Sequence, residues 1–276
     1  MKKLHLFGEP VTPQAFIGLT IIGIYAILAF FAPIISPYDA TETLGPVWGP
    51  PEWGHWLGFD NLGRDMLSRI IYGTPVTIGT ALAASILSYL IGCTLGFIAA
   101  MSSSFVDGII SRVMDVFLAI PTLVFALALL TVFNGIFALI AAIGILSAPR
   151  VFRIARAVAM DITALEYVEV ARLRGEPLRW IIFQEVAPNA LPALVAEFGL
   201  RVSYSLLFIS SLSFLGFGVQ PPLADWGSLV RENVLVIGFG GFAALYPAGA
   251  LALLAVGVSL VVDWVLSFGQ RKGEEW

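Results

Sequence analysis

Long runs without charged residues divide the chain into segments. The first run covers about Gln14–Ile35, and the second lies between Arg69 and Asp107. Two further runs, about Ala190–Phe214 and Phe242–Phe268, are mostly apolar and contain only Glu197, Arg201 and Asp263 as charged residues. A helix needs about 20 mostly apolar residues to cross a bilayer core of about 30 Å. Each of these runs therefore predicts one transmembrane helix.

The stretch Ile109–Arg156 is too long for one membrane helix and leaves little room for two. Asn134 and Gly135 near its middle form a dipeptide that favours a turn. This turn predicts two helices joined by a very short loop. The pattern as a whole therefore predicts an all-α integral membrane protein with six transmembrane helices.

The positions of lysine and arginine orient these helices, because both residues accumulate in cytoplasmic loops. With six helices and a cytoplasmic N-terminus, the six arginines from Arg150 to Arg179 fall on the cytoplasmic side. One helix fewer would place this cluster outside the cell. We therefore expect cytoplasmic tails at residues 1–13 and 269–276, and an external loop at residues 37–74.

The first apolar run is expected to remain in the protein as the first span, residues 14–36. It is longer than the core of a secretory signal and lacks a small-residue cleavage site. The other five spans form a core at residues 75–268. The external loop between the two contains three tryptophans, which are typical of side chains at headgroup depth. These tryptophans are Trp48, Trp53 and Trp56.

Composition supports a membrane protein and excludes several other classes. Apolar residues make up 58% of the chain and charged residues 12%, against about 25% charged residues in soluble domains. The net charge of −4 includes no basic tail, so no nucleic-acid partner is expected. Cys93 is the single cysteine, and His5 and His55 are the two histidines, which excludes an intrachain disulfide and provides too few ligands for a metal cage.

A charged segment, residues 161–188, separates the fourth and fifth predicted spans. Its first part, Glu166–Arg174, predicts a helix; Gly175 suits the left-handed position that ends one, and Pro177 suits the first turn of the next. We expect Pro188 to end this second helix. The result is a helical hairpin at the membrane surface, with charged and aromatic side chains left to contact a partner. From these residues alone, an interfacial hairpin with its arginines near lipid phosphates is an equally good interpretation.

The order of residues in this hairpin resembles the EAA motif of ABC importer permeases. Glu169, Ala171, Gly175 and Pro188 stand at matching positions. Three positions depart from the usual motif: Val170, Glu185 and Ala187.

Three further segments resemble the dipeptide, oligopeptide and nickel class of these permeases. They are LGFDNLGRDMLSRIIYG at residues 57–73, DGIISRVMDVFLAIPTLVFAL at 107–127 and SLSFLGFGVQPPLADWGSLV at 211–230. With the hairpin, the resemblance extends over residues 57–263. Four ordered matches are more specific than the EAA motif alone.

This resemblance implies the fold of a type I ABC importer permease in the bacterial inner membrane. It implies a second homologous permease subunit, two cytoplasmic ABC ATPase subunits, an external substrate-binding protein and membrane lipid as partners. The implied substrate is a peptide or peptide-like solute, with nickel chelates, opines and oligosaccharides as alternatives. The hairpin would then be the coupling helix that docks on an ATPase. The hairpin residues expected to serve this coupling are Glu166, Glu169, Ala171, Arg172, Arg174, Gly175, Arg179, Trp180, Phe183 and Pro188.

The chain itself is expected to bind no nucleotide and to be no enzyme. A P-loop needs a lysine in the pattern G-x-x-x-x-G-K-[ST]. The lysines are Lys2, Lys3 and Lys272, and none has that setting. ATP and Mg²⁺ would therefore belong to the partner ATPase subunits, and we expect no catalytic residue, cofactor or metal here.

Two charged residues, Glu197 and Arg201, lie inside the fifth predicted span. They are one helical turn apart, so they can form an ion pair. Ionisable residues within a membrane usually face the bundle interior or a water-filled path. Together with Tyr204 they are either the lining of a translocation path or a self-neutralising structural pair, and the sequence leaves both open.

The external signature Gly63, Arg64 and Asp65 has three interpretations. The alternatives are a contact with a binding protein, a plug at the outer mouth of the path, and a local salt bridge that holds the loop, which is the favoured interpretation. In the second span, small residues recur at every fourth position, which predicts close helix packing within the chain. These small residues are Ala84, Ser88, Gly92, Gly96 and Ala100.

Two other classes of membrane protein fit the sequence less well. An ion-coupled secondary carrier predicts inverted repeats and several acidic groups at the middle of the membrane. Only Glu197 meets this expectation, and no internal repeat is evident. A membrane enzyme needs a catalytic constellation at one depth, and the spans contain none.

Overall fold

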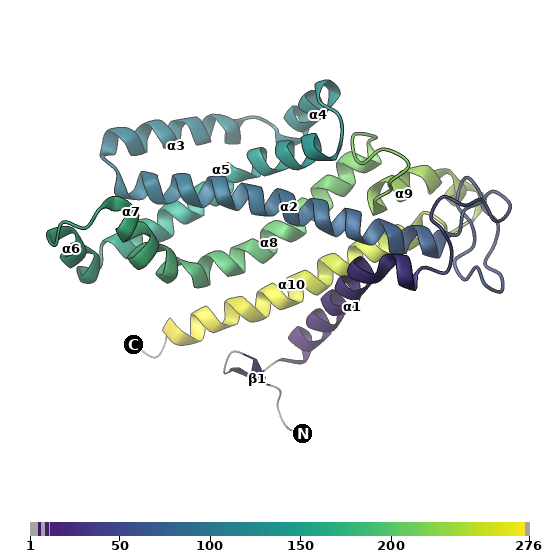
Figure 1. Cartoon of the computed structure of the whole chain (residues 1–276), viewed down its shortest axis with the longest axis horizontal. Coiled ribbons are helices and arrows are strands. Elements are labelled where there is room, and N and C mark those ends of the chain that lie inside the picture. Colours follow the sequence, from purple (N-terminus) through teal and green to yellow (C-terminus); the bar gives the residue numbers. More distant parts are fainter. Residues whose placement is uncertain (1–4, 7–8, 11, 274–276) are drawn as a thin grey trace.

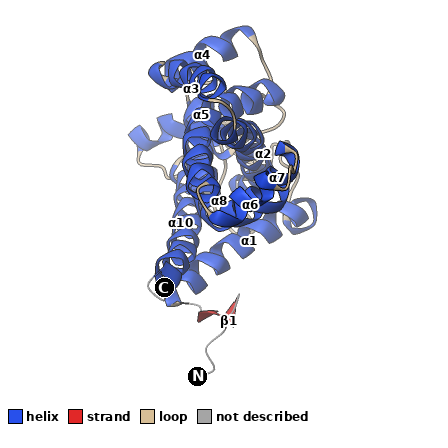
Figure 2. Cartoon of the chain, turned by 90° about the vertical axis from the view of Figure 1, so that its left-hand side faces the viewer, coloured by secondary structure: helices blue, strands red, loops and turns tan. Residues whose placement is uncertain are grey.

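The computed structural model describes residues 5–6, 9–10 and 12–273, with side chains over residues 12–267. Nearly all of its regular structure is helical, and one short strand pair precedes the first helix (Figures 1 and 2). β1 (His5–Leu6) pairs antiparallel with β2 (Glu9–Pro10). The predicted all-α class is confirmed. Lys2, Lys3 and residues 274–276 of the predicted tails lie outside the described residues.

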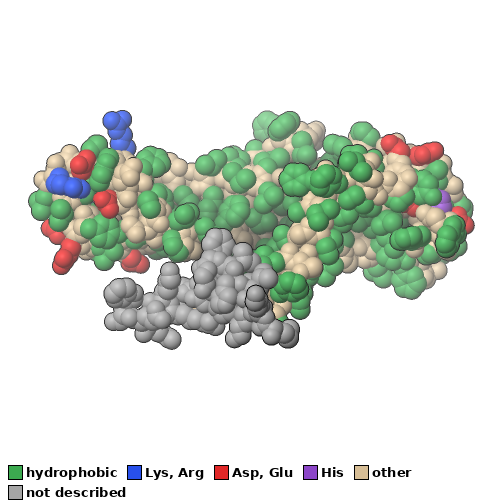
Figure 3. Space-filling view, turned by 60° about the horizontal axis from the view of Figure 1, so that its bottom comes forward, with side chains coloured by type: hydrophobic (Ala, Val, Ile, Leu, Met, Phe, Trp, Pro, Cys, Tyr) green, Lys and Arg blue, Asp and Glu red, His purple; other side chains and the backbone are tan. Residues whose placement is uncertain are grey.

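Among the described residues, five helical segments are long and apolar enough to cross a membrane, and a bent pair of helices supplies a sixth candidate. The five contain α1 (Pro13–Ile35), α2 (Met66–Met101), α5 (Ile136–Thr163), α8 (Ala187–Phe214) and α10 (Leu245–Gly273). The bent pair is α3 (Ser104–Ala119) and α4 (Thr122–Val132). Large apolar side chains remain exposed along the middle of the bundle, and the charged side chains gather at its two ends (Figure 3).

The bent pair α3 and α4, which lies between α2 and α5 in the chain, was not predicted from the sequence. α3 and α4 meet at an angle of 86° around Pro121. Proline disfavours helical geometry in the residue before it, and Ile120 is accordingly extended, with ψ of 130°. The predicted turn at Asn134 and Gly135 is present, because Gly135 has a φ of +99° and precedes α5.

The long helices run side by side along one axis of the molecule (Figure 1). The short helices α6 (Glu166–Leu173) and α7 (Leu178–Ile181) lie at one end. The loop of residues 36–65 and α9 (Trp226–Asn233) lie at the opposite end. α1 begins and α10 ends away from this loop, so the described ends of the chain point toward the side of α6 and α7.

Small residues bring α2 close to α5, as predicted from their four-residue spacing. A Cβ at Gly92 would lie 2.6 Å from Val151 Cβ, and one at Gly96 would lie 2.9 Å from Ala155 Cβ. Ala84 is fully buried in the same helix. The small-residue ladder is therefore a packing surface within this chain.

α2 begins earlier than expected. The predicted external loop extended to residue 74, whereas the helix starts at Met66. Asp65 caps it by accepting a hydrogen bond from the Ser68 amide at 2.8 Å. The charge of Arg69 made this turn resemble a loop, but Arg69 is buried and ion-paired inside the fold.

The prediction that Pro188 ends the second hairpin helix is wrong. α7, the π-helical segment η1 (Ile182–Val186) and α8 form one helical segment from Leu178 to Phe214. Pro188 stands in the first turn of α8, where proline is compatible with a helix. The hairpin is therefore directly continuous with a membrane span.

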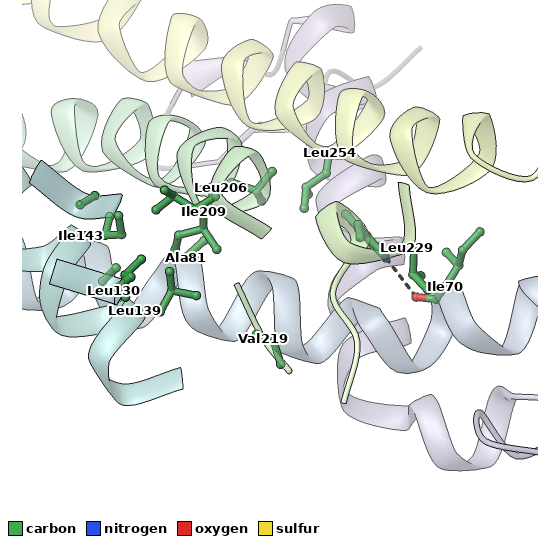
Figure 4. Close-up of a cluster of buried hydrophobic side chains, with 14 of the residues drawn as sticks. Ile70, Ala81, Leu130, Leu139, Ile143, Leu206, Ile209, Val219, Leu229 and Leu254 are labelled. Carbon is green, nitrogen blue, oxygen red and sulfur yellow. Dashed lines mark hydrogen bonds between the residues drawn. The ribbon is translucent and has the colours of Figure 1, made fainter. Parts of the chain in front are cut away.

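A single large apolar core joins the span helices at the end that carries α9 (Figure 4). It contains Ile143 of α5, Ile209 of α8 and Leu254 of α10. Trp226 of α9 is fully buried there and donates its indole N–H to the Ile70 carbonyl at 3.1 Å. The 3-10 helix η2 (Val234–Phe239) follows α9. This core holds α9 within the bundle.

Candidate functional site

The hairpin has the local geometry that its sequence predicted. α6 ends before Gly175, which has a φ of +77°. The Gly175 amide donates to the Arg172 carbonyl at 2.9 Å, and Pro177 precedes α7. A left-handed residue here favours glycine because it has no Cβ. The two helices lie at the extreme end of the bundle (Figure 1).

One face of the hairpin is buried against the long helices. Val168, Ala171 and Ile181 are buried, and they share a core with Phe97 of α2 and Ala155 of α5. Ala171 was expected among the coupling residues, but its side chain is fully covered. Its small size instead allows α6 to pack closely against the bundle.

The opposite face of the hairpin is exposed and carries most of the predicted coupling residues. The exposed charged members are Glu166, Glu169, Arg172, Arg174 and Arg179. Phe183 is 72% exposed, and Pro188 is also exposed. Trp180 is half-buried, with the Arg174 guanidinium 5.7 Å from its ring. Part of the Trp180 side chain therefore already contacts another residue of the hairpin.

Leu173 was missed by the sequence analysis. Its side chain is 82% exposed at the C-terminal end of α6. A large apolar residue beside a left-handed glycine in a charged segment was the signal that could have identified it. With Phe183 it gives the hairpin an apolar surface between the charges.

The predicted pair in α8 forms inside the bundle. Arg201 donates a hydrogen bond from its guanidinium to the Glu197 carboxylate, and Arg201 is only 8% exposed. The Arg201 guanidinium carbon lies 5.7 Å from the centre of the Tyr204 ring. Arg150 of α5 lies over the same ring at 5.0 Å. Sequence reasoning assigned Arg150 to the cationic cluster and missed its contact with this group.

The external signature forms a local ion-pair network. Arg64 Nε donates to Asp60 Oδ2 at 2.6 Å, and another Arg64 nitrogen lies 3.1 Å from Glu232 of α9. Arg69 binds the same Glu232 oxygen at 3.0 Å. Gly63 has a φ of +72° in the turn before Arg64. The local salt bridge is therefore present, and Glu232 is a member that the sequence did not indicate.

Asp225 is a buried acid outside the span helices. It caps α9 by accepting a hydrogen bond from the Ser228 amide at 2.8 Å, and it also bonds to the Ser213 hydroxyl. Burial raises the pKa of its carboxyl above the ordinary value. The cap fixes the start of the helix that carries Glu232.

Comparison with known proteins decides the family. Residues 92–272 match the family described as "Binding-protein-dependent transport system inner membrane component". The chain belongs to this family. It is therefore a multi-pass inner-membrane permease subunit of an ABC importer, and family membership implies ATPase and substrate-binding-protein partners.

Similarity to curated relatives extends over most of the chain. It is 32% identical to the glutathione transport system permease protein GsiD of Pectobacterium atrosepticum, over 89% of this chain and 82% of that protein. It is 32% identical to the oligopeptide transport system permease protein OppC of Bacillus subtilis, over 90% and 82%. It is 34% identical to the dipeptide transport system permease protein DppC of Haemophilus influenzae, over 90% and 87%.

A solved structure shows the same fold. A chain of the MetNI methionine ABC transporter in an inward-facing conformation matches with a TM-score of 0.62 and 16% sequence identity. The match covers 73% of this chain and 96% of that chain. The predicted fold of an ABC importer permease is confirmed.

Proposed function

We propose that this chain forms, with a second homologous permease subunit, the membrane path for peptides or peptide-like solutes. The observation that carries the proposed substrate is the similarity, over about nine tenths of the chain, to permeases named for oligopeptide, dipeptide and glutathione transport. An external binding protein delivers the solute, and two cytoplasmic ABC ATPase subunits supply the energy. ATP and Mg²⁺ are bound in those subunits.

The exposed face of the hairpin is the proposed contact with the ATPase. Its arginines belong to a residue type that is enriched at interface hot spots. Its glutamates supply further polar contacts, and Leu173 and Phe183 add exposed apolar surface. Ala171 and Gly175 hold the shape of the hairpin. This assignment places the hairpin, and with it both termini, in the cytoplasm, in agreement with the arginine bias.

The helical continuity from Leu178 to Phe214 explains how such a contact moves the path. A helix without a flexible loop transmits a displacement of α7 to α8. α8 carries Glu197, Arg201 and Tyr204, which we assign to the wall of the path. Closure of the ATPases would therefore tilt the wall that contacts the solute.

Reconstitution of the four-component complex with its binding protein tests this function. Proteoliposomes containing ATP should accumulate a labelled dipeptide or tripeptide, and omission of the binding protein should abolish accumulation. Uptake of a nickel chelate, an opine or an oligosaccharide in place of peptides would replace the proposed substrate. ATP-independent uptake driven by an ion gradient would contradict the proposal as a whole.

A further inference from the structure

Two arginines, one tyrosine and one carboxylate join α5 to α8 within the bundle. The guanidinium carbons of Arg150 and Arg201 lie 5.0 and 5.7 Å from the centre of the same Tyr204 ring. Glu197 is paired with Arg201. The group contains two positive charges and one negative charge, so one positive charge remains.

This remaining charge has no protein partner among the described side chains. Within residues 12–267, Arg150 makes no ion pair and no hydrogen bond, and its guanidinium group lies over the face of the Tyr204 ring. Arg201 is 8% exposed, and its Nε atom is buried without a hydrogen-bond partner. A charge within a membrane-spanning helix and a buried unsatisfied donor are both costly. An anion bound by the two guanidinium groups would lower both costs.

We propose that Arg150 and Arg201 form a carboxylate subsite that binds the negatively charged C-terminus of the transported solute. This inference rests on the proposed peptide function. Guanidinium groups match a carboxylate in shape and charge, because their N–H groups form parallel hydrogen bonds to its two oxygens. The Tyr204 ring holds the two guanidinium groups near one another, at 5.0 and 5.7 Å from its centre.

Glu197 adjusts the strength of this subsite. Its carboxylate occupies one guanidinium nitrogen of Arg201, so it competes with an incoming carboxylate. A transport site must bind its solute strongly enough to admit it and weakly enough to release it. The internal carboxylate keeps Arg201 ordered between transport cycles and limits the affinity for the solute.

The subsite lies beside an open face of α8. Leu200 and Leu207 precede and follow Tyr204 by about one helical turn and are 42% and 47% exposed. Leu207 and Ser211 also line a groove of about 400 Å³ between α8, α4 and α10. A solute that moves along this face of α8 passes Tyr204 and the two arginines.

Chemical modification of arginine tests the subsite in the assembled complex with its partner permease and ATPases. Arg150 is modified with phenylglyoxal in the presence of either N-acetylglycine or N-acetylglycinamide at equal concentration. Mass spectrometry measures the extent of modification in each case. We expect the carboxylate to slow modification of Arg150 at least threefold relative to the amide. Arg153 is exposed three residues further along α5 and serves as the control, which should react equally in both solutes.

Glu197→Gln removes the competing carboxylate and keeps the size of the side chain. Protection of Arg150 by N-acetylglycine should increase in this variant, and protection equal to or below that of wild type would contradict competition by Glu197. Equal modification of wild-type Arg150 in the two solutes would overturn the subsite.

Peptide uptake is measured separately on the same complex. Absence of all peptide uptake would refute the proposed substrate, while protection by the carboxylate would still support the subsite.

Discussion

Arg69 of α2 and Glu232 of α9 form an ion pair at 3.0 Å across 163 residues of sequence. The side chain of Arg69 is 3% exposed, and the same Glu232 oxygen also binds Arg64. This pair ties the loop of residues 36–65, the start of α2 and the helix α9 together. It fixes this end of the permease as one unit.

Glu232→Gln should destabilise the end of the protein that carries α9. Loss of this carboxylate leaves the Arg69 guanidinium buried beside Asp60 alone. Removing one partner of a buried ion pair costs about 3 kcal/mol. Thermal unfolding of the purified protein in detergent should show a lower midpoint. Glu52→Gln changes an exposed acid in the same loop and should leave the midpoint nearly unchanged.

Gly92→Ala should weaken the packing of α2 against α5. The added methyl group would lie 2.6 Å from Val151 Cβ and 2.8 Å from the Ala148 carbonyl, so one helix must shift. Overpacking of this kind costs about 1–3 kcal/mol. Gly79→Ala is the matched control in the same helix, because nothing lies within 4 Å of its new Cβ. Equal unfolding midpoints for the two variants would contradict close packing at Gly92.

Phe183→Ala should reduce association with the ATPase subunits. Phe183 is 72% exposed on the hairpin, and an apolar anchor at an interface contributes about 2 kcal/mol or more. Copurification at limiting ATPase concentration should fall about tenfold or more, since tenfold corresponds to about 1.4 kcal/mol. Phe137→Ala removes an 84% exposed phenylalanine at the start of α5 and should copurify like wild type. Equal losses in both variants would remove the hairpin from the interface.

Cysteine labelling in cells should reveal the orientation of the bundle. The native thiol is first removed by Cys93→Ser. The test uses cells with an intact inner membrane and an outer barrier that lets an impermeant maleimide pass. In this background the maleimide should label Trp53→Cys, because Trp53 is fully exposed in the loop that is predicted to be external. Arg174→Cys should react only after the inner membrane is opened. The reverse pattern would place the hairpin outside and exclude docking on a cytoplasmic ATPase.

Asp225→Asn should change how stability depends on pH. Burial raises the pKa of Asp225 above its value of about 3.9 in the unfolded chain. The folded state therefore binds this proton more tightly than the unfolded chain does, and the bound proton adds to the free energy of unfolding. This contribution is fully present below about pH 4 and is lost as pH rises through the folded pKa. The variant should lose less stability than wild type between pH 4 and 7 in thermal unfolding. Equal losses of stability in the two proteins over this pH range would contradict a raised pKa for Asp225.

The sequence alone located the five long apolar helices and the turn of the hairpin, but not the bend between α3 and α4. Gly175 and Pro177 act through local backbone preferences, so their roles could be predicted from neighbouring residues. Pro188 misled the analysis because proline is allowed in the first turn of a helix as well as after its end. Arg69 misled it because a single charge inside an apolar run resembles a loop until its partner is known.

Lipid as a solvent explains why so much could be read from the chain itself. Each segment that crosses a bilayer must satisfy its own backbone hydrogen bonds and must be apolar over a fixed length, and both requirements are written in consecutive residues. The tertiary structure alone decided which hairpin face is buried, that Glu232 pairs with Arg64 and Arg69, and that Arg150 lies over Tyr204. Those contacts join residues far apart in the chain, and they depend on the rotation and crossing of whole helices, which hydropathy does not specify.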